Sequence, residues 1–438
     1  MGAGGDDRIS DLHDDLLGKI ISRLPVKDAA RTAALASRWR HLWRSTALYL
    51  NDEHLPEGTR AATIARVLAE HPGPFRAVRI FGCKFVNQSP ELAEWPRLLE
   101  AKTIKKLAFA NQTSTGDLCL PADILRCTSL ERLVMVKWTL PDHLTHSLRV
   151  FPHLELLAIL SITMSDQALG CLLDASPVLE TLILDCSIKC FHLCNQKLRC
   201  VMVCPVEEFA VVEAPLLERL ILFKTRRTAS PLRVKIASTS NLRVLGYMEP
   251  MIHRMQINGN MINPDTLASP STLVPGIQIL ALKVNFSILE EVKMAASLLR
   301  CFPNVYTLHI QSVMCDPSET AHEPNGEHHA RFWKEASPVT CLTSHVERIV
   351  FHKFQGHREE FEFLKFVARD AKALQCLLLV QSKEKLLSTD EVNVMIDKLE
   401  CPWFRAWTSK VLLVSSKVED EWSYVKLSMD LTIDDPFC

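Results

Sequence analysis

The densest group of potentially reactive side chains is a run of cysteines interrupted by one histidine. The run DCSIKCFHLCNQKLRCVMVC contains Cys186, Cys190, His192, Cys194, Cys200 and Cys204. Thiolates and imidazoles are ligands of zinc, and four of them in a tetrahedron form a structural zinc site. The spacing argues against one, because the close C-x₂-C pairs typical of metal-binding loops are absent. Cysteine also packs well as a small apolar residue, so we predict core positions and no bound metal.

Histidines in the polar stretch 316–340 form a second group with metal-binding potential. His322, His328 and His329 lie there, but a solvated loop or insertion explains this composition more simply. A nucleophilic cysteine needs a neighbouring base, and the spacing identifies none. The sequence shows no phosphate-binding, dinucleotide-binding, serine-hydrolase or protein-kinase motif, and no paired cysteines of a RING. We therefore predict a protein that is not an enzyme and uses no cofactor.

The composition indicates a large apolar interior and a balanced charge. Apolar residues make up 47% of the 438 residues, enough for two or three folded domains. Lys and Arg total 50 and Asp and Glu total 51, so no electrostatic basis for binding nucleic acid or an anionic membrane is expected. The 15 cysteines without a secretory signal, and the lack of a run long enough to span a membrane, favour reduced thiols in the cytoplasm or the nucleus.

Three short helices are predicted at the front of the chain, over residues 12–43. Leu16, Ile20 and Leu24 recur with helical spacing, and Pro25 ends the first helix. A second short helix follows, and Ser37 is the expected N-cap of a third. Helices this short bury little surface, so the module needs a partner or a neighbouring domain. From the residues alone, a cap on a repeat array and a partner-binding module explain it equally well.

The residues LHDDLLGKIISRLPVKDAARTAALASRWRHLW closely resemble the F-box, which docks substrate receptors onto the Skp1-type adaptor of cullin-RING ubiquitin ligases. His13 departs from the pattern, since the family usually has proline there. The resemblance implies an apolar surface toward the adaptor, with some side chains, Trp39 above all, serving internal packing instead. Carried over position by position, this surface comprises Leu12, Leu16, Ile20, Leu24, Pro25, Leu35, Trp39 and Trp43.

An apolar-x-x-apolar-x-apolar pattern recurs along the rest of the chain. Most triads begin 24 to 29 residues after the previous one, near the period of leucine-rich repeats. Each repeat is expected to contain a strand and a helical or irregular return segment, and SDQALGCLLDASP is expected to be a helical return. The stacked strands would form a parallel sheet over the buried triads. The triads are Phe75-Val78-Ile80, Ile104-Leu107-Phe109, Leu130-Leu133-Met135, Leu154-Leu157-Ile159, Leu179-Leu182-Leu184, Leu198-Val201-Val203, Leu217-Leu220-Leu222, Leu242-Leu245-Tyr247, Ile277-Leu280-Leu282, Val305-Leu308-Ile310, Val346-Ile349-Phe351 and Leu374-Leu377-Leu379.

Near the C-terminus the pattern predicts a strand, a turn at Gly356, an amphipathic helix and another strand. Phe361, Leu364 and Val367 mark the inner face of that helix. This segment resembles the FBD domain of plant F-box proteins. Together with the front module and the repeats, it makes most of the chain similar to the plant F-box/LRR/FBD family. We expect this part to cap the open edge of the repeats.

The expected fold is therefore α/β: a three-helix F-box, an irregular leucine-rich-repeat solenoid and an FBD-like C-terminal cap. The expected boundaries are 6–50 for the F-box, 51–74 for a linker, 75–315 for the repeats, 316–340 for the polar insertion and 341–438 for the FBD-like domain. The predicted function is substrate recognition in an Skp1–cullin–F-box ubiquitin ligase, with the F-box on the adaptor and the repeats on an unidentified client protein. Two alternatives stay open: a non-enzymatic repeat scaffold with an F-box-like cap, and a metal- or redox-responsive protein that uses the cysteines.

Overall fold

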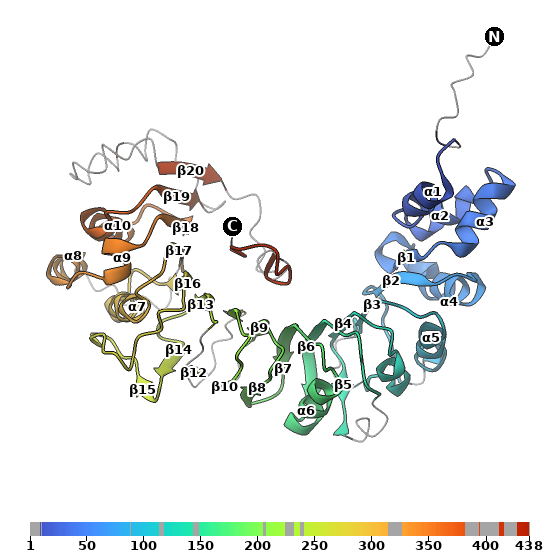
Figure 1. Ribbon diagram of the computed structural model, residues 1–438, viewed down its shortest axis with the longest axis horizontal. Helices are drawn as coiled ribbons and strands as arrows, with labels where there is room; N and C mark the ends of the chain where they lie inside the picture. Colours follow the sequence, from blue (N-terminus) through green and yellow to red (C-terminus); the bar gives the residue numbers. More distant parts are fainter. Residues whose placement is uncertain are drawn as a thin grey trace, which may run out of the picture. The chain divides into compact units, whose positions relative to one another are not determined.

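The computed structural model contains two compact units, Met1–Ile188 and Lys189–Cys438 (Figure 1). It describes residues 9, 11–87, 89–113, 118–142, 149–204, 207–223, 232–236, 241–313, 326–381, 394, 411–415 and 427–437. Among the helices in these ranges, none has both the length and the apolar character needed to cross a bilayer.

The first unit begins with three short helices: α1 (Asp14–Ile21), α2 (Val26–Thr32) and α3 (Ser37–Ser45). Helix α1 ends at Ile21, so Leu24, which was expected in this helix, lies between α1 and Pro25, the N-cap residue of α2. The N-cap of α3 is Ala36 and not Ser37, so the predicted cap is displaced by one residue. At α1 the N-cap is His13, whose Nδ1 accepts a hydrogen bond from the Asp15 N–H at 3.4 Å. The histidine therefore caps the helix where the F-box pattern has proline.

Parallel strands follow in sequence order, each paired with the next. They are β1 (Leu48–Asn51), β2 (Phe75–Ile80), β3 (Lys106–Ala110), β4 (Arg132–Val136), β6 (Leu156–Met164) and β7 (Thr181–Cys186), with the short β5 (Thr139–Leu140) beside β6. The register aligns Val78, Leu107, Leu133, Leu157 and Leu182. These are the middle members of five predicted triads, and all five side chains are buried. The predicted register of the first unit is therefore confirmed.

The return segments of the first unit are mostly helical. They contain η1 (Asp52–His54), η2 (Glu57–Thr59), α4 (Arg60–Glu70), α5 (Pro90–Ala101), η3 (Ala122–Arg126) and α6 (Asp166–Asp174). Helix α6 is the predicted helical return, and Ser165 caps it by accepting from the Ala168 N–H at 3.0 Å. Residues 51–74, expected to be a linker, instead include α4, which buries Ile64 and Leu68 and contacts α5. Helix α4 is amphipathic and α5 covers its apolar side, so this segment is a packed part of the fold and not a linker.

The second unit contains two sheets, whose strands pair in parallel except for β15, which pairs with β14 in the antiparallel direction. The larger has the order β9 (Cys200–Val203), β11 (Arg219–Leu222), β13 (Val244–Met248), β16 (Ile279–Val284), β17 (Thr307–Ser312), β18 (Arg348–Phe354), β19 (Cys376–Gln381) and β20 (Val411–Ser415). Its register aligns further middle members of the triads, all buried: Val201, Leu220, Leu245, Leu280, Leu308, Ile349 and Leu377. The smaller sheet has the order β15 (Asn260–Met261), β14 (His253–Ile257), β12 (Leu232–Ile236), β10 (Glu208–Glu213) and β8 (Cys190–Cys194).

The smaller sheet corrects the expectation of helical or irregular return segments. Between the strands of the larger sheet, from β9 to β16, the chain returns through strands. In β8 the buried Phe191 and Leu193 alternate with exposed residues, and such period-two alternation is typical of a strand with one covered face. Phe191 packs on Phe209 of β10 with ring centroids 5.8 Å apart. In this region the core therefore lies between two sheets, and not between one sheet and a layer of helices.

One predicted triad, Leu242-Leu245-Tyr247, departs from the pattern in its third member. The register between β13 and β16 shifts after Leu245, so that Met248 aligns with Leu282. Met248 fills the core position predicted for Tyr247. The tyrosine ring lies instead 5.0 Å from the ring of Phe437, near the end of the chain. A local bulge of this kind re-aims one side chain without disturbing the neighbouring strands.

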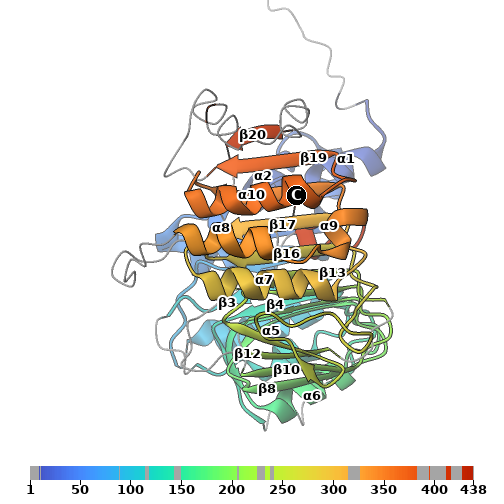
Figure 2. The same cartoon turned by 90° about the vertical axis from the view of Figure 1, so that its left-hand side faces the viewer.

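Helices cover one side of the larger sheet (Figures 1 and 2). They are α7 (Leu289–Cys301), α8 (Gly326–Glu335), α9 (Thr340–Ser344) and α10 (Arg358–Asp370). The strand β18, Gly356 with φ of 74°, α10 and β19 confirm the predicted strand, turn, helix and strand. Part of the expected polar insertion, 316–325, lies outside the described residues. The remainder contains α8, whose Trp333 is buried 4.5 Å from the ring of Phe366, so this part is packed and not a solvated loop.

Candidate functional site

Helix α1 buries one apolar stripe and exposes another. Leu17 and Ile21 are fully buried, and α1 contacts α3. Leu16 is 46% exposed and Ile20 is 40% exposed. Because an α-helix has about 3.6 residues per turn, residues 16 and 20 form a separate stripe from residues 17 and 21. The outward stripe keeps apolar surface in water, which is the property of a site that a partner covers.

Other apolar side chains of the front module are also exposed or partly exposed. Leu35 is 68% exposed, and Leu12, Leu24 and Pro25 are partly exposed. Ile9, which was not among the predicted adaptor residues, is also exposed. The only sequence signal for it was a single apolar residue in a polar stretch.

The two tryptophans of α3 lie in internal contacts. Trp39 is buried. The ring of Trp43 lies edge-on to that of His71, with centroids 4.8 Å apart, and His71 in turn lies 5.2 Å from Phe75 of β2. Burial lowers the pKa of His71, which keeps the ring neutral in this apolar contact. The front module therefore joins the first parallel strands through aromatic packing.

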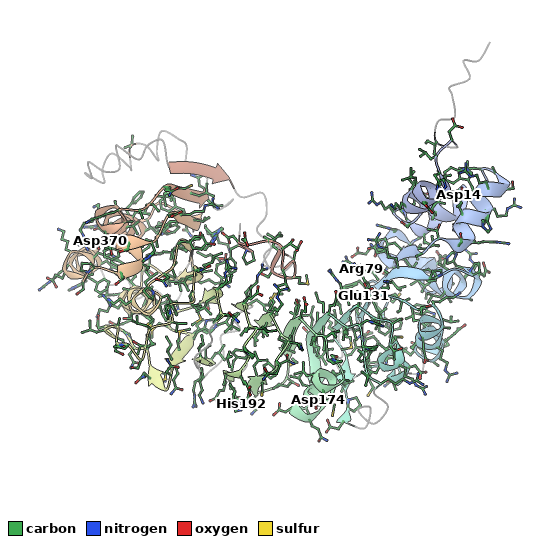
Figure 3. All side chains as sticks on the ribbon, viewed as in Figure 1. Asp14, Arg79, Glu131, Asp174, His192 and Asp370 are labelled. Atoms are coloured by element: carbon green, nitrogen blue, oxygen red, sulfur yellow. The ribbon has the colours of Figure 1, made fainter. Side chains whose placement is uncertain are left out.

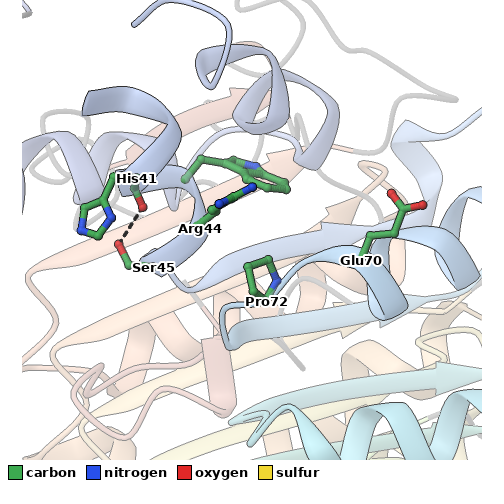
Figure 4. A pocket seen from close by; sticks show the side chains of 6 residues that line it. His41, Arg44, Ser45, Glu70 and Pro72 are labelled. Atoms are coloured by element: carbon green, nitrogen blue, oxygen red, sulfur yellow. Dashed lines mark hydrogen bonds between the residues drawn. The ribbon is translucent and has the colours of Figure 1, made fainter. Parts of the chain in front are cut away.

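An open pocket of about 610 Å³ lies beside the Trp43–His71 contact. It is lined by His41, Trp43, Arg44, Ser45, Glu70 and Pro72 (Figure 4). A serine near a histidine raises the question of nucleophilic catalysis. The Ser45 hydroxyl, however, donates to the backbone carbonyl of His41 at 3.2 Å and not to its imidazole. The lining therefore offers no activated nucleophile.

The structure separates the cysteines that the sequence brings close together. The predicted core position is wrong for Cys190 and Cys194, which are exposed on β8, and it is confirmed for the buried Cys200 and Cys204. His192, between the two exposed cysteines in β8, is exposed as well (Figure 3). Burial raises the pKa of Cys200 to about 12, so this thiol stays protonated and unreactive. Over the described part of the chain, no three His, Cys, Asp or Glu side chains are grouped so that they could hold a metal ion. The absence of bound metal stays a prediction for the purified protein.

The predicted histidine group is not assembled by the described residues. His322 lies outside them. His328 is exposed and His329 is buried, at consecutive positions of α8. Consecutive helical residues project about 100° apart, which does not favour joint coordination of one ion.

A basic strip lies where the strands of the first unit begin. Arg76, Lys106 and Arg132 start or nearly start β2, β3 and β4. Burial first, and then the neighbouring Arg132 and Arg76, lower the pKa of Lys106. The net charge of the chain gives no sign of this strip; the register places Lys106 opposite Arg132 on one side and opposite Ala77, the neighbour of Arg76, on the other. Glu131 and Glu155 also lie near Lys106 and offset part of this charge, so the strip by itself identifies no partner.

In-register parallel strands over buried apolar triads, preceded by a three-helix module, define a leucine-rich-repeat protein. Family models match the same parts of the chain. An F-box domain matches residues 9–51, the LRR repeats of FBD-associated F-box protein At5g56370 match residues 92–310, and an FBD domain matches residues 334–379. The chain belongs to the plant F-box/LRR/FBD family.

Relatives in Arabidopsis thaliana match the chain over different extents. F-box/LRR-repeat protein At3g26922 is 32% identical over 142 residues, which cover 31% of this chain and 46% of that protein. F-box/FBD/LRR-repeat protein At4g00160 is 24% identical over 431 residues, covering 90% and 89%. F-box/FBD/LRR-repeat protein At5g56420 is 22% identical over 430 residues, covering 90% and 94%. The chain thus spans less than half of the first relative and most of the other two.

Proposed function

We propose that the chain is a substrate-recognition subunit of an Skp1–cullin–F-box ubiquitin ligase. The observation that carries the proposal is the outward stripe of Leu16 and Ile20 on α1, inside the segment that the F-box model matches. Covering one Leu or Ile at an interface contributes about 1.5–3 kcal/mol, so two or three such residues supply the centre of a stable contact.

The proposed adaptor-binding surface combines the exposed stripe with its surroundings. Trp39 and Trp43 hold the helices in place from inside, and the other residues contact the adaptor directly. Its members are Leu12, Leu16, Ile20, Leu24, Pro25, Leu35, Trp39 and Trp43.

The repeats are proposed to hold the client protein. Parallel strands paired in sequence order within each unit support an irregular leucine-rich-repeat solenoid, and the FBD-like part supports a cap at its C-terminal edge. The chain itself performs no chemistry in this proposal. Holding a client beside a charged ubiquitin carrier raises the effective concentration of the reacting groups. Action in the cytoplasm or the nucleus follows from this role.

A repeat scaffold with an F-box-like cap is the second candidate. The aromatic contact of Trp43 with His71 favours it, because a cap must pack on the first repeat. The two candidates differ in what covers the exposed stripe of α1. In the scaffold, nothing has to cover it.

Capture of a purified Skp1-type adaptor by the full-length protein tests the proposal. We expect capture by the wild type and its loss in Ile20→Asp, since the change would bury an unpaired charge at the interface. Val86→Asp places the same charge on an exposed apolar residue outside the front module and serves as the matched control. Absence of capture by the wild type, or equal capture by both variants, would leave the scaffold as the better explanation.

A further inference from the structure

The C-terminal segment, residues 427–437, packs on the larger sheet of the second unit, on the side away from α7 and α10 (Figure 1). Strand alternation places Arg219, Gly246, Ala281 and His309 on this side, opposite the buried leucines. We call it the Arg219 face. Ser428 and Phe437 of the segment are both buried there. The chain thus covers with its own end a sheet surface that faces away from the helices.

Arg219 holds the backbone of the segment. It is only 4% exposed, and its guanidinium donates to the carbonyls of Ser428 at 3.2 Å, Asp430 at 3.0 Å and Leu431 at 3.3 Å, and to that of Ile433. Every peptide carries such carbonyls. The arginine therefore recognises the path of the bound segment and not its side chains.

His309 recognises a carboxylate. Its Nε2 lies 3.0 Å from Oδ2 of Asp435, and its Nδ1 lies 3.1 Å from Nε2 of His352. Burial, and then the neighbouring His309, lower the pKa of His352 to about 3, so His352 is neutral and can donate from Nε2. Nε2 of His309 can donate to the carboxylate whether His309 is neutral or charged, because the ring lies at hydrogen-bond distance from it. The pair of histidines therefore presents a donor to an acidic side chain.

An aromatic ring fits beside this histidine. The ring of Phe437 lies 5.0 Å from that of Tyr247 and 5.3 Å from that of His309. Gly246 leaves room for it, since a Cβ at this position would lie 2.9 Å from the Phe437 ring. The register shift after Leu245 thus accompanies a buried Tyr247 whose ring forms one wall of the aromatic site.

We propose that the Arg219 face binds a client segment with an aspartate two residues before a phenylalanine, and that residues 427–437 occupy this face until such a client displaces them. The inference deepens the proposed function, because it names a contact between the repeats and a client. These contacts are typical of a peptide-binding site. Arg219 binds the peptide backbone, His309 binds a carboxylate, and the ring of Phe437 is a single aromatic anchor. The attached segment competes at a high effective concentration, so it sets a threshold for client affinity.

The test uses the full chain with a protease site in place of residues 417–422, cut after purification so that folding precedes cleavage. A fluorescent peptide with the sequence of residues 427–437 is added, and its binding is followed by anisotropy. We expect saturable exchange with the cut chain and no binding to the uncut chain. Competitor peptides with Asp435→Asn or Phe437→Ala should be weaker by at least about tenfold. Asp434→Asn removes the same charge from the adjacent, exposed residue and should change competition by less than about twofold.

Two results would overturn the inference: retention of the cut segment under all native conditions, or unfolding of the second unit when the segment leaves. Either would make residues 427–437 a permanent part of the core. Equal weakening by Asp434→Asn and Asp435→Asn would contradict the carboxylate site. Adaptor capture by the same cut protein separates this test from that of the proposed function. Capture without exchange rejects only the present inference, and exchange without capture rejects only the adaptor-binding role.

Discussion

Leu16 and Leu17 are consecutive residues of α1 in opposite environments: Leu16 is 46% exposed, and Leu17 is fully buried. Leu17 belongs to the stripe that holds the three front helices together. Leu16 belongs to the stripe that faces outward. Folding and binding of the front module therefore depend on different residues that are neighbours in the chain, and substitutions can separate the two.

We predict that Leu16→Asp abolishes adaptor capture while the front module stays folded. The charge lies in water in the free protein and would be buried unpaired only in the complex. Leu17→Ala should instead lower the free energy of unfolding by about 2–5 kcal/mol, because it leaves a cavity between the helices. Adaptor pull-down and denaturant unfolding of each variant measure the two effects. Normal capture by Leu16→Asp would show that the outward stripe is not the contact.

A second prediction concerns the register of the repeats. Leu182 is fully buried in β7, and Val178, four residues earlier, is 42% exposed. Leu182→Ala should destabilise the first unit by about 2–5 kcal/mol. Val178→Ala should stay within about 0.5 kcal/mol of the wild type, as is usual for surface substitutions. Calorimetry of the full-length variants gives both values, and similar effects of the two substitutions would contradict the register.

A third prediction concerns acid stability of the second unit. Burial, and then the nearby Lys283, lower the pKa of His253 to about 3, and its Nδ1 accepts a hydrogen bond from the Glu249 N–H at 2.8 Å. Below the unfolded-state pKa of about 6.5, the unfolded chain binds a proton that the folded chain excludes. Stability should therefore fall as the pH decreases from about 6.5 toward 3, by up to about 1.4 kcal/mol per pH unit for this histidine.

The variant His253→Asn isolates this effect. Asparagine retains an acceptor for the Glu249 N–H but does not titrate. Urea unfolding of both proteins at pH 7, 6 and 5 should give a shallower pH dependence for the variant. Parallel curves would mean that His253 binds protons as readily in the folded protein as in the unfolded chain.

A fourth prediction concerns the cysteines. We expect less than stoichiometric zinc in the purified protein and no change of its thermal midpoint with EDTA. Cys190 and Cys194 are exposed and should react with a thiol reagent in the native state, whereas the buried Cys200 should react only after unfolding. Elemental analysis and mass spectrometry of the labelled sites check both expectations. About one zinc per chain, lost in the double variant Cys190→Ser and Cys194→Ser, would revive the metal-responsive alternative.

The periodic parts of the fold could be predicted from the sequence. The triads predict that Leu107, Leu182, Leu280 and Leu377 lie in the core. Each strand turns the same position inward, so apolar residues recur in the sequence at the length of one repeat. The helix after Gly356 and the F-box helices were predictable for the same reason, since local periodicity and proline position encode them. The prediction of a linker at 51–74 was wrong, because the polar and charged residues at its start drew attention away from the amphipathic pattern of α4.

The sequence by itself determined which segments are the strands that carry the triads, which of their leucines are buried and which family the front module resembles, because spacings of a few residues encode these features. It did not predict the strands of the smaller sheet. Only the tertiary structure decided that Leu16 faces outward and Leu17 inward, since both fit the same helical pattern until α3 covers one side. It alone brings His309 to Asp435 across 126 positions of the chain. Contacts between segments so far apart leave no local period, and they form only when a strand of the sheet and the end of the chain meet in space.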